Sequence, residues 1–135
     1  MAVKILSDSA CDLPDEILEE YNIDTLPILV SKGEEEYLDK VTLDPKTMYD
    51  EMRKGVVYKT AQIPPQMFSE KFEEIAKNNE SVIYVCFSSG LSGTYNTSLI
   101  VRDETKRKYP DLDIDIVDSR SASVGFGLLV YKAAK

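Results

Sequence analysis

Hydroxyl-bearing and small residues gather over Ser88–Thr94, where the sequence reads Ser-Ser-Gly-Leu-Ser-Gly-Thr. Small residues let a ligand approach the backbone, and a helix that begins inside such a loop offers N–H groups to an anion. Ser92 is expected at the start of the next helix, where its hydroxyl and the N–H groups of Gly93 and Thr94 could hold a carboxylate or phosphate. The alternative is that Ser92 only caps the helix. The loop matches neither a Walker motif nor Gly-x-Gly-x-x-Gly.

Two other sets of residues are candidates for chemistry. Thr60 and Gln62 offer a hydroxyl and an amide in a loop. Asp8 and Asp118 follow expected strands, where carboxylates either bind magnesium or orient loop backbones. One alternative is therefore a small magnesium-dependent phosphatase or phosphotransferase that uses Asp8, although Asp8-Ser9-Ala10 lacks the second Asp common to such sites. Another is an interaction domain without a ligand, in which the serine loops are only caps.

Residue types that are missing exclude several classes of enzyme. The 135 residues include no His, which excludes Ser-His-Asp and Cys-His arrangements in their common forms and His-ligated zinc. Cys11 and Cys86 form no Cys-x-x-Cys motif. Cys86 lies in an apolar stretch and is expected to be buried, while the carboxylates beside Cys11 raise its pKa and make it a poor nucleophile. We expect no catalytic constellation, metal or cofactor.

Composition is typical of a globular domain with an acidic surface. Apolar residues make up 43% of the chain and charged residues 30%, and the net charge is −8. This charge argues against a nucleic-acid partner, because phosphate backbones require clustered Lys and Arg. Residues 1–9 have neither the basic start nor the apolar stretch of a secretory signal, and no apolar run approaches the ~20 residues of a membrane span. The cytoplasm is the expected location.

Apolar strands alternate with amphipathic helices along the chain. Strands are expected over 3–6, 23–30, 82–87 and 114–117. Helices are expected after Pro14, Pro45 and Pro65, from Tyr95 to about Tyr109, and from Ser121 to the end, whereas residues 56–63 are expected to be irregular. The run 82–87 is continuously apolar, as in a parallel strand buried on both faces. The alternation predicts an α/β fold with a mainly parallel sheet and helices on both faces.

Ligands of parallel α/β sheets bind beyond the carboxyl ends of the strands. Three hydroxyl-rich segments are expected to meet at that edge, because each follows an expected strand: Ser7–Ser9, Ser88–Thr94 and Asp118–Ser121.

Four segments, in this order over the whole chain, resemble the DegV family of fatty-acid-binding proteins. They are Val3–Leu13, Lys59–Pro65, Ser88–Tyr95 and Val117–Ser123. The Leu-Ser-Gly-Thr-Tyr sequence in the third is quite specific. Members of the family are about twice as long and carry a second α/β domain. The resemblance therefore implies that residues 1–135 are a DegV-type N-terminal domain without the C-terminal domain, which agrees with the apolar end of the chain.

The resemblance also implies a ligand and its contacts. It implies that Thr60 and Ser92 hold the carboxylate of a long-chain fatty acid such as palmitate. The other residues of this binding set are Gln62, Ser89, Gly93 and Thr94. Ala61 stands where the family's Thr-Ser-Gln motif has Ser, so one hydroxyl near the head group is missing.

The resemblance implies a carrier, because relatives present the bound fatty acid to a separate fatty acid kinase that phosphorylates the carboxylate. The domain alone is expected to fold but to bind fatty acid weakly, since half of the wall around the acyl chain is missing. Its uncovered apolar surface is expected to favour self-association.

Overall fold

The larger of two sheets is wholly parallel in the computed structural model, which describes residues 2–135. Its strands lie in the order β2-β1-β6-β7. They are β1 (Val3–Asp8), β2 (Ile23–Leu26), β6 (Ser81–Cys86) and β7 (Asp113–Asp118). Ile5 of β1 lies opposite Ile23 of β2 and Ile83 of β6, so β1 is paired on both sides. The predicted parallel sheet is confirmed, and the apolar run 82–87 lies in its interior.

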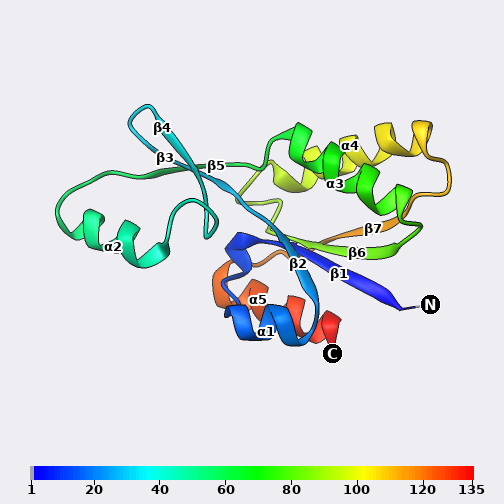
Figure 1. The fold of residues 1–135 in the computed structure, drawn as a ribbon, viewed down its shortest axis with the longest axis horizontal. Coiled ribbons are helices and arrows are strands. Elements are labelled where there is room, and N and C mark those ends of the chain that lie inside the picture. The colour runs from blue at the N-terminus through cyan, green and yellow to red at the C-terminus, as the bar shows by residue number, and fades with distance from the viewer. Residues whose placement is uncertain (1) are drawn as a thin grey trace.

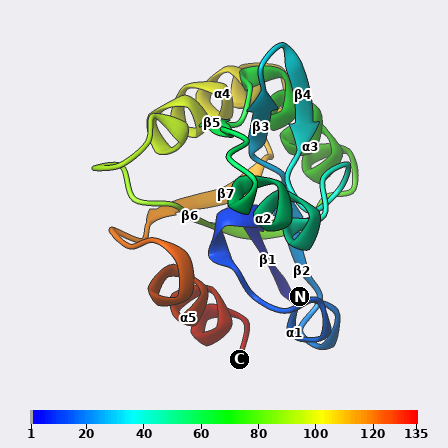
Figure 2. The same cartoon turned by 90° about the vertical axis from the view of Figure 1, so that its left-hand side faces the viewer.

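Helices cover both faces of this sheet, as predicted (Figures 1 and 2). On one face lie α3 (Pro65–Lys77) and α4 (Thr94–Lys108), and on the other lie α1 (Asp15–Glu20) and α5 (Ser123–Ala134). Side chains of a strand alternate between faces, so each strand contributes to two cores. Tyr84 packs with Phe68 and Phe72 on the α3–α4 side, whereas its neighbour Val85 packs with Phe126 on the α5 side.

A small antiparallel sheet lies beside the main sheet, together with α2 (Pro45–Arg53) (Figure 1). Its strands, in the order β4-β3-β5, are β3 (Leu29–Lys32), β4 (Glu35–Leu38) and β5 (Lys59–Ala61). This sheet corrects two predictions. The strand expected over 23–30 is divided at Pro27, which has no N–H for a ladder, and its halves join different sheets. The segment 56–63, expected to be irregular, contains β5, which pairs with β3.

The chain changes faces between β1 and β6. After β1 it forms a 3-10 turn, η1 (Ser9–Cys11), and continues to α1 on one face, whereas after β6 it enters α4 on the other. The connections that follow the two central strands therefore leave toward opposite faces of the sheet, and open α/β sheets form a crevice for ligands at such a point. None of the helices within residues 2–135 is both long enough and apolar enough to cross a membrane.

Candidate functional site

A cavity of about 300 Å³ lies beyond the carboxyl ends of β1 and β6, between the connections that follow them. Its polar lining residues are Asp8, Thr60, Gln62, Ser92, Gly93 and Thr94, and its apolar ones are Ala10, Ile28, Ala61, Phe87 and Leu91. Five of the six residues predicted to bind a ligand thus lie around one space, although they come from segments some 30 residues apart. The volume is at the lower end of the ~300–1,000 Å³ usual for small-molecule sites.

Ser92 lies just before α4 and also lines the cavity. The N-cap of α4 is Gly93, which has no side chain for capping, so the expected role of Ser92 as the cap is not the one observed. Its Oγ instead accepts a hydrogen bond from the N–H of the first helical residue, Thr94, at 3.2 Å and lies 2.9 Å from the Thr94 Oγ1. A hydroxyl can accept and donate at the same time, so this contact does not prevent Ser92 from donating to a ligand. The first turn of α4 carries no acidic residue, which leaves its N-terminal partial positive charge uncompensated there.

Gly93 lies beside Gln62, so the start of α4 and the segment after β5 approach each other at this side of the cavity. A Cβ built on Gly93 would overlap the Oε1 of Gln62, so a side chain at this position would displace the Gln62 amide. Glycine leaves room for the Gln62 amide beside the start of α4. The segments around Gln62 and Gly93 are therefore held next to each other.

Thr60 is positioned by the small sheet. It lies in β5 opposite Val30 of β3, and Ala61 lies opposite Leu29. β5 is exposed along its three residues and is paired on one side only, to β3. The Thr60 wall of the cavity thus belongs to the small sheet, whereas the Ser92 wall is the loop between β6 of the main sheet and α4.

Ser89 does not line the cavity. Its Oγ donates to Asp118 Oδ2 at 2.5 Å, and its N–H donates to Asp118 Oδ1 at 3.1 Å. Asp118 also accepts from the N–H of Arg120 at 3.0 Å, and these hydrogen bonds, that from the Ser89 hydroxyl first, lower the pKa of its carboxyl group. The third hydroxyl-rich segment, 118–121, therefore supports the loop of Ser89 instead of reaching the cavity.

Asp8 lines the cavity and is fully buried. Its Oδ1 accepts from the Ala10 N–H at 3.0 Å, and its Oδ2 from the Phe87 N–H and the Tyr84 O–H, both at 3.4 Å. Burial raises its pKa from 3.8 to about 6, despite these donors. The partners of Asp8 are thus N–H and O–H groups, and within residues 2–135 no three His, Cys, Asp or Glu side chains are grouped to hold a metal ion.

The pKa of Asp8 makes protein stability depend on pH in a defined way. Because the folded-state pKa lies above the unfolded value of 3.8, the folded protein binds more protons between pH 4 and pH 6. The contribution of Asp8 to stability is therefore largest below pH 4 and is lost as pH rises through 6. We expect the free energy of unfolding of the wild type, relative to Asp8→Asn, to fall by ~3 kcal/mol from pH 4 to pH 7. Urea unfolding of both proteins at pH 4, 5.5 and 7 measures this; a constant difference would contradict it.

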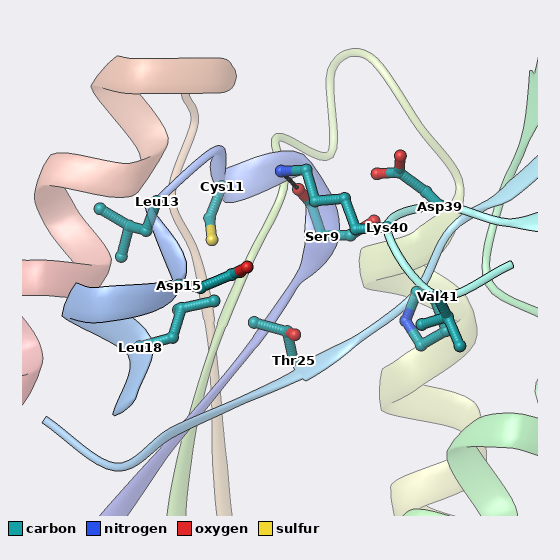
Figure 3. A pocket seen from close by; sticks show the side chains of 10 residues that line it. Ser9, Cys11, Leu13, Asp15, Leu18, Thr25, Asp39, Lys40 and Val41 are labelled. Carbon is teal, nitrogen blue, oxygen red and sulfur yellow. Dashed lines mark hydrogen bonds between the residues drawn. The ribbon is translucent and has the colours of Figure 1, made fainter. Parts of the chain in front are cut away.

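A second, smaller cavity of about 100 Å³ lies on the other side of the η1 turn (Figure 3). Lys40, which is drawn beside Ser9, donates through Nζ to the Ser9 carbonyl oxygen at 2.8 Å and to Asp12 Oδ1 at 2.9 Å. Cys11 also lines this cavity, and burial raises the pKa of its thiol. The lysine is already engaged with backbone and carboxylate, so these contacts fasten the segment after β4 to the η1 turn.

Apolar residues of the larger cavity were not foreseen from the sequence. Phe87 and Leu91 flank the predicted serine loop, and Ala10 follows the predicted Asp8, so their closeness to those segments was the available signal. Ile28 gave no such signal. It reaches the cavity because its N–H donates to the Ser9 Oγ at 3.1 Å, a contact between residues 19 positions apart.

A family model described as "uncharacterised protein, DegV family" matches residues 2–135. The chain belongs to the DegV family. A DegV domain-containing protein of Clostridium perfringens is 46% identical over 133 residues, which are 97% of this chain and 46% of that protein. The chain thus spans about half the length of the curated DegV relatives that it matches.

Solved DegV-type structures share this fold. A stearic acid-binding protein from Eubacterium ventriosum has a TM-score of 0.94 and 29% identity, over 98% of this chain and 46% of that one. The Fatty Acid Kinase (Fak) B3 protein of Streptococcus pneumoniae, solved with linoleic acid, has a TM-score of 0.78 and 25% identity, over 98% of this chain and 47% of that one. One of these neighbours is thus described as binding stearic acid and the other as loaded with linoleic acid.

Proposed function

We propose that this chain forms the head-group-binding half of a fatty-acid carrier. The observation that carries the proposal is the cavity beyond the carboxyl ends of β1 and β6, where Thr60 and Gln62 lie together with Ser92, Gly93 and Thr94 at the start of α4. Neighbours with this fold hold stearic and linoleic acids. In the proposal the acyl carboxylate accepts hydrogen bonds from the Thr60 and Ser92 hydroxyls and lies at the positive end of α4.

The carboxylate and the acyl chain of the ligand contribute differently to the binding free energy. A hydrogen bond to a charged acceptor contributes ~1–3 kcal/mol, and each buried methylene contributes ~0.8 kcal/mol before ordering costs. Affinity therefore comes mainly from the tail, and the hydroxyls fix the position of the carboxylate. Ala10, Ile28, Phe87 and Leu91 supply apolar surface for the first methylenes. The second half found in the relatives supplies the remaining wall.

We infer that the partner is a fatty acid kinase, because a neighbour of this fold is a Fatty Acid Kinase B3 protein. In this scheme the kinase transfers a phosphoryl group to a carboxylate oxygen of the bound acid, and the chain described here holds that carboxylate in place. The protein acts as a carrier and not as the catalyst. A cytoplasmic location agrees with Cys11 and Cys86, which are both free and buried.

The test uses an extended chain, in which residues 1–135 are followed by the second half of the Clostridium perfringens relative. Native mass spectrometry of the purified extended chain is expected to show one long-chain fatty acid per protein, lost on delipidation and regained when stearate is added. Adding a fatty acid kinase and ATP is then expected to convert the bound acid to its acyl phosphate. Magnesium-dependent phosphatase activity of the extended chain without a kinase, or no uptake of stearate, would contradict the proposal.

A further inference from the structure

Asp8 lines the cavity, but the proposed function assigns it no contact with the ligand. A carboxylate that lines a site for another carboxylate is unfavourable, because two negative charges then share a space with little water. Within residues 2–135 no lysine or arginine lines this cavity, so this half of the site has no cation that could offset the charge of Asp8. A proton on Asp8 is the way in which this half can remove that charge when an anion binds.

The contacts of Asp8 indicate where a proton can reside. The Ala10 N–H lies 3.0 Å from Oδ1, a normal hydrogen bond, whereas the Phe87 N–H and Tyr84 O–H lie 3.4 Å from Oδ2 and are weak donors. Oδ2 is thus the less firmly occupied oxygen and can carry a hydrogen. A protonated carboxyl group has one O–H donor and keeps acceptor capacity, so Tyr84 and Phe87 can still donate to Oδ2 while its hydrogen remains available to a ligand.

The ionisable groups around Asp8 do not provide another site for this proton. Burial raises the pKa of Tyr84 well above its usual value and that of Cys86 to about 12, so both stay neutral at physiological pH. Burial also raises the pKa of the Cys11 thiol, on the η1 side. Asp12 is an exposed carboxylate paired with Lys40, and its charge raises the pKa of Asp8 further.

The more distant ionisable groups do not change this assignment. On the β7 side, Asp118 accepts hydrogen bonds from Ser89 and has a lowered pKa, so it is ionised. β2 pairs with Asp8 through Leu26, which does not ionise. The chain contains no His. Among residues 2–135, Asp8 is thus the group lining the cavity whose protonation changes close to neutral pH.

Granted the proposed function, on which this step rests, we propose that Asp8 is the third polar contact of the head group and takes up one proton when an acyl carboxylate binds. The proton comes from solution and is placed on Oδ2, from where it is donated to a carboxylate oxygen of the ligand. No bond other than the new O–H forms, and the bound pair carries one negative charge instead of two. Above pH 6 the empty site is ionised, so binding requires this uptake and weakens as pH rises.

The experiment measures the affinity of the extended chain for a fluorescent long-chain fatty acid between pH 5.5 and 8.5. The monomeric ligand stays ionised over this range, as a simple carboxylic acid does. For the wild type we expect constant affinity near pH 5.5 and a decrease approaching ~10-fold per pH unit above pH 6.5. Asp8→Asn, whose amide is neutral and can donate from the place of Oδ2, is expected to bind with the same affinity at pH 6 and pH 8.5. The matching fatty alcohol, which has no charge, is expected to bind the wild type independently of pH.

Tyr84→Phe provides a second variant in case Asp8→Asn does not fold. It keeps the buried ring but removes the O–H that donates to Asp8, so the decrease in affinity is expected to begin at a higher pH than in the wild type. Parallel pH profiles of the wild type and Asp8→Asn, or no shift in Tyr84→Phe, would overturn the role of Asp8. Failure of the wild type to bind the fatty acid at any pH would instead overturn the proposed function.

Discussion

Replacing both Thr60 and Ser92 by Ala in the extended chain should abolish most of the contribution of the carboxylate to fatty-acid binding. Each single replacement is expected to weaken binding by ~1–3 kcal/mol, because each removes one hydroxyl donor to a charged acceptor. The double variant is expected to lose less than the sum, since the two hydroxyls share one ligand group. Titration with a long-chain fatty acid at pH 6 measures all four proteins.

Ser89→Ala is the matched control for the hydroxyl variants. It makes the same hydroxyl-to-hydrogen change in the loop that contains Ser92, but the Ser89 hydroxyl is bound to Asp118 and lies outside the cavity. Its effect on affinity is expected to be smaller than that of Ser92→Ala. A methyl ester or alcohol of the same acyl chain should distinguish the variants less than the free acid does. Unchanged affinity in the Thr60→Ala, Ser92→Ala double variant would end this assignment of the head-group site.

The 135-residue chain alone should bind a long-chain fatty acid far more weakly than the extended chain does. The cavity of about 300 Å³ holds the head-group donors, but only a few apolar residues lie around it. Each methylene left in water forfeits ~0.8 kcal/mol, so five exposed methylenes reduce the affinity by ~1,000-fold. The same fluorescence titration, applied to both proteins under identical conditions, measures the ratio.

The control for this comparison is the folding of the shorter chain. Both faces of its main sheet are covered by helices, with Phe68, Phe72 and Phe126 fully buried, so a cooperative thermal transition is expected. Weak binding would then reflect the incomplete wall and not loss of structure. Equal affinity of the two proteins would mean that the acyl site is complete within residues 1–135 and that the second half is not needed.

The main sheet was predictable because its signals are local. The apolar run at 82–87 and the spacing of Phe68, Phe72 and Ile75 each identify an element without reference to the rest of the chain. Part of the small sheet is equally local, because β3 and β4 form a hairpin around the turn at Gly33 and an extended 36–38 segment after this turn is readable from the sequence. Its third strand, β5, was not predictable, because it depends on pairing at a distance. Lys59–Ala61 is too short to show a period, and it is a strand only because Leu29–Ser31 pairs with it.

The candidate site was predictable only in part, for a related reason. Composition indicates an anion site at Ser92, but nothing in the spacing connects Ser92 with Thr60, and the resemblance to a family made that connection. Three-dimensional placement then separates residues that look alike in sequence. Ser89 and Ser92 are three positions apart, yet one hydroxyl supports a neighbouring loop and the other lines the cavity. Burial gives Asp8 its raised pKa, and burial is a property of the folded molecule.

The two walls of the cavity are held by different parts of the fold, one by the small sheet and one by the loop after β6 of the main sheet. This arrangement affects the entropy of binding. The chain passes from the main sheet to the small one at Pro27 and returns through Pro64 and Pro65, and proline rings restrict φ at both crossings. The Ile28 N–H and the Lys40 ammonium add hydrogen bonds to Ser9. The small sheet is therefore held close to its final placement before a ligand arrives. A ligand that contacts both walls therefore does not have to order them, and little of its binding free energy is spent on conformational entropy. The site is preorganised in this sense.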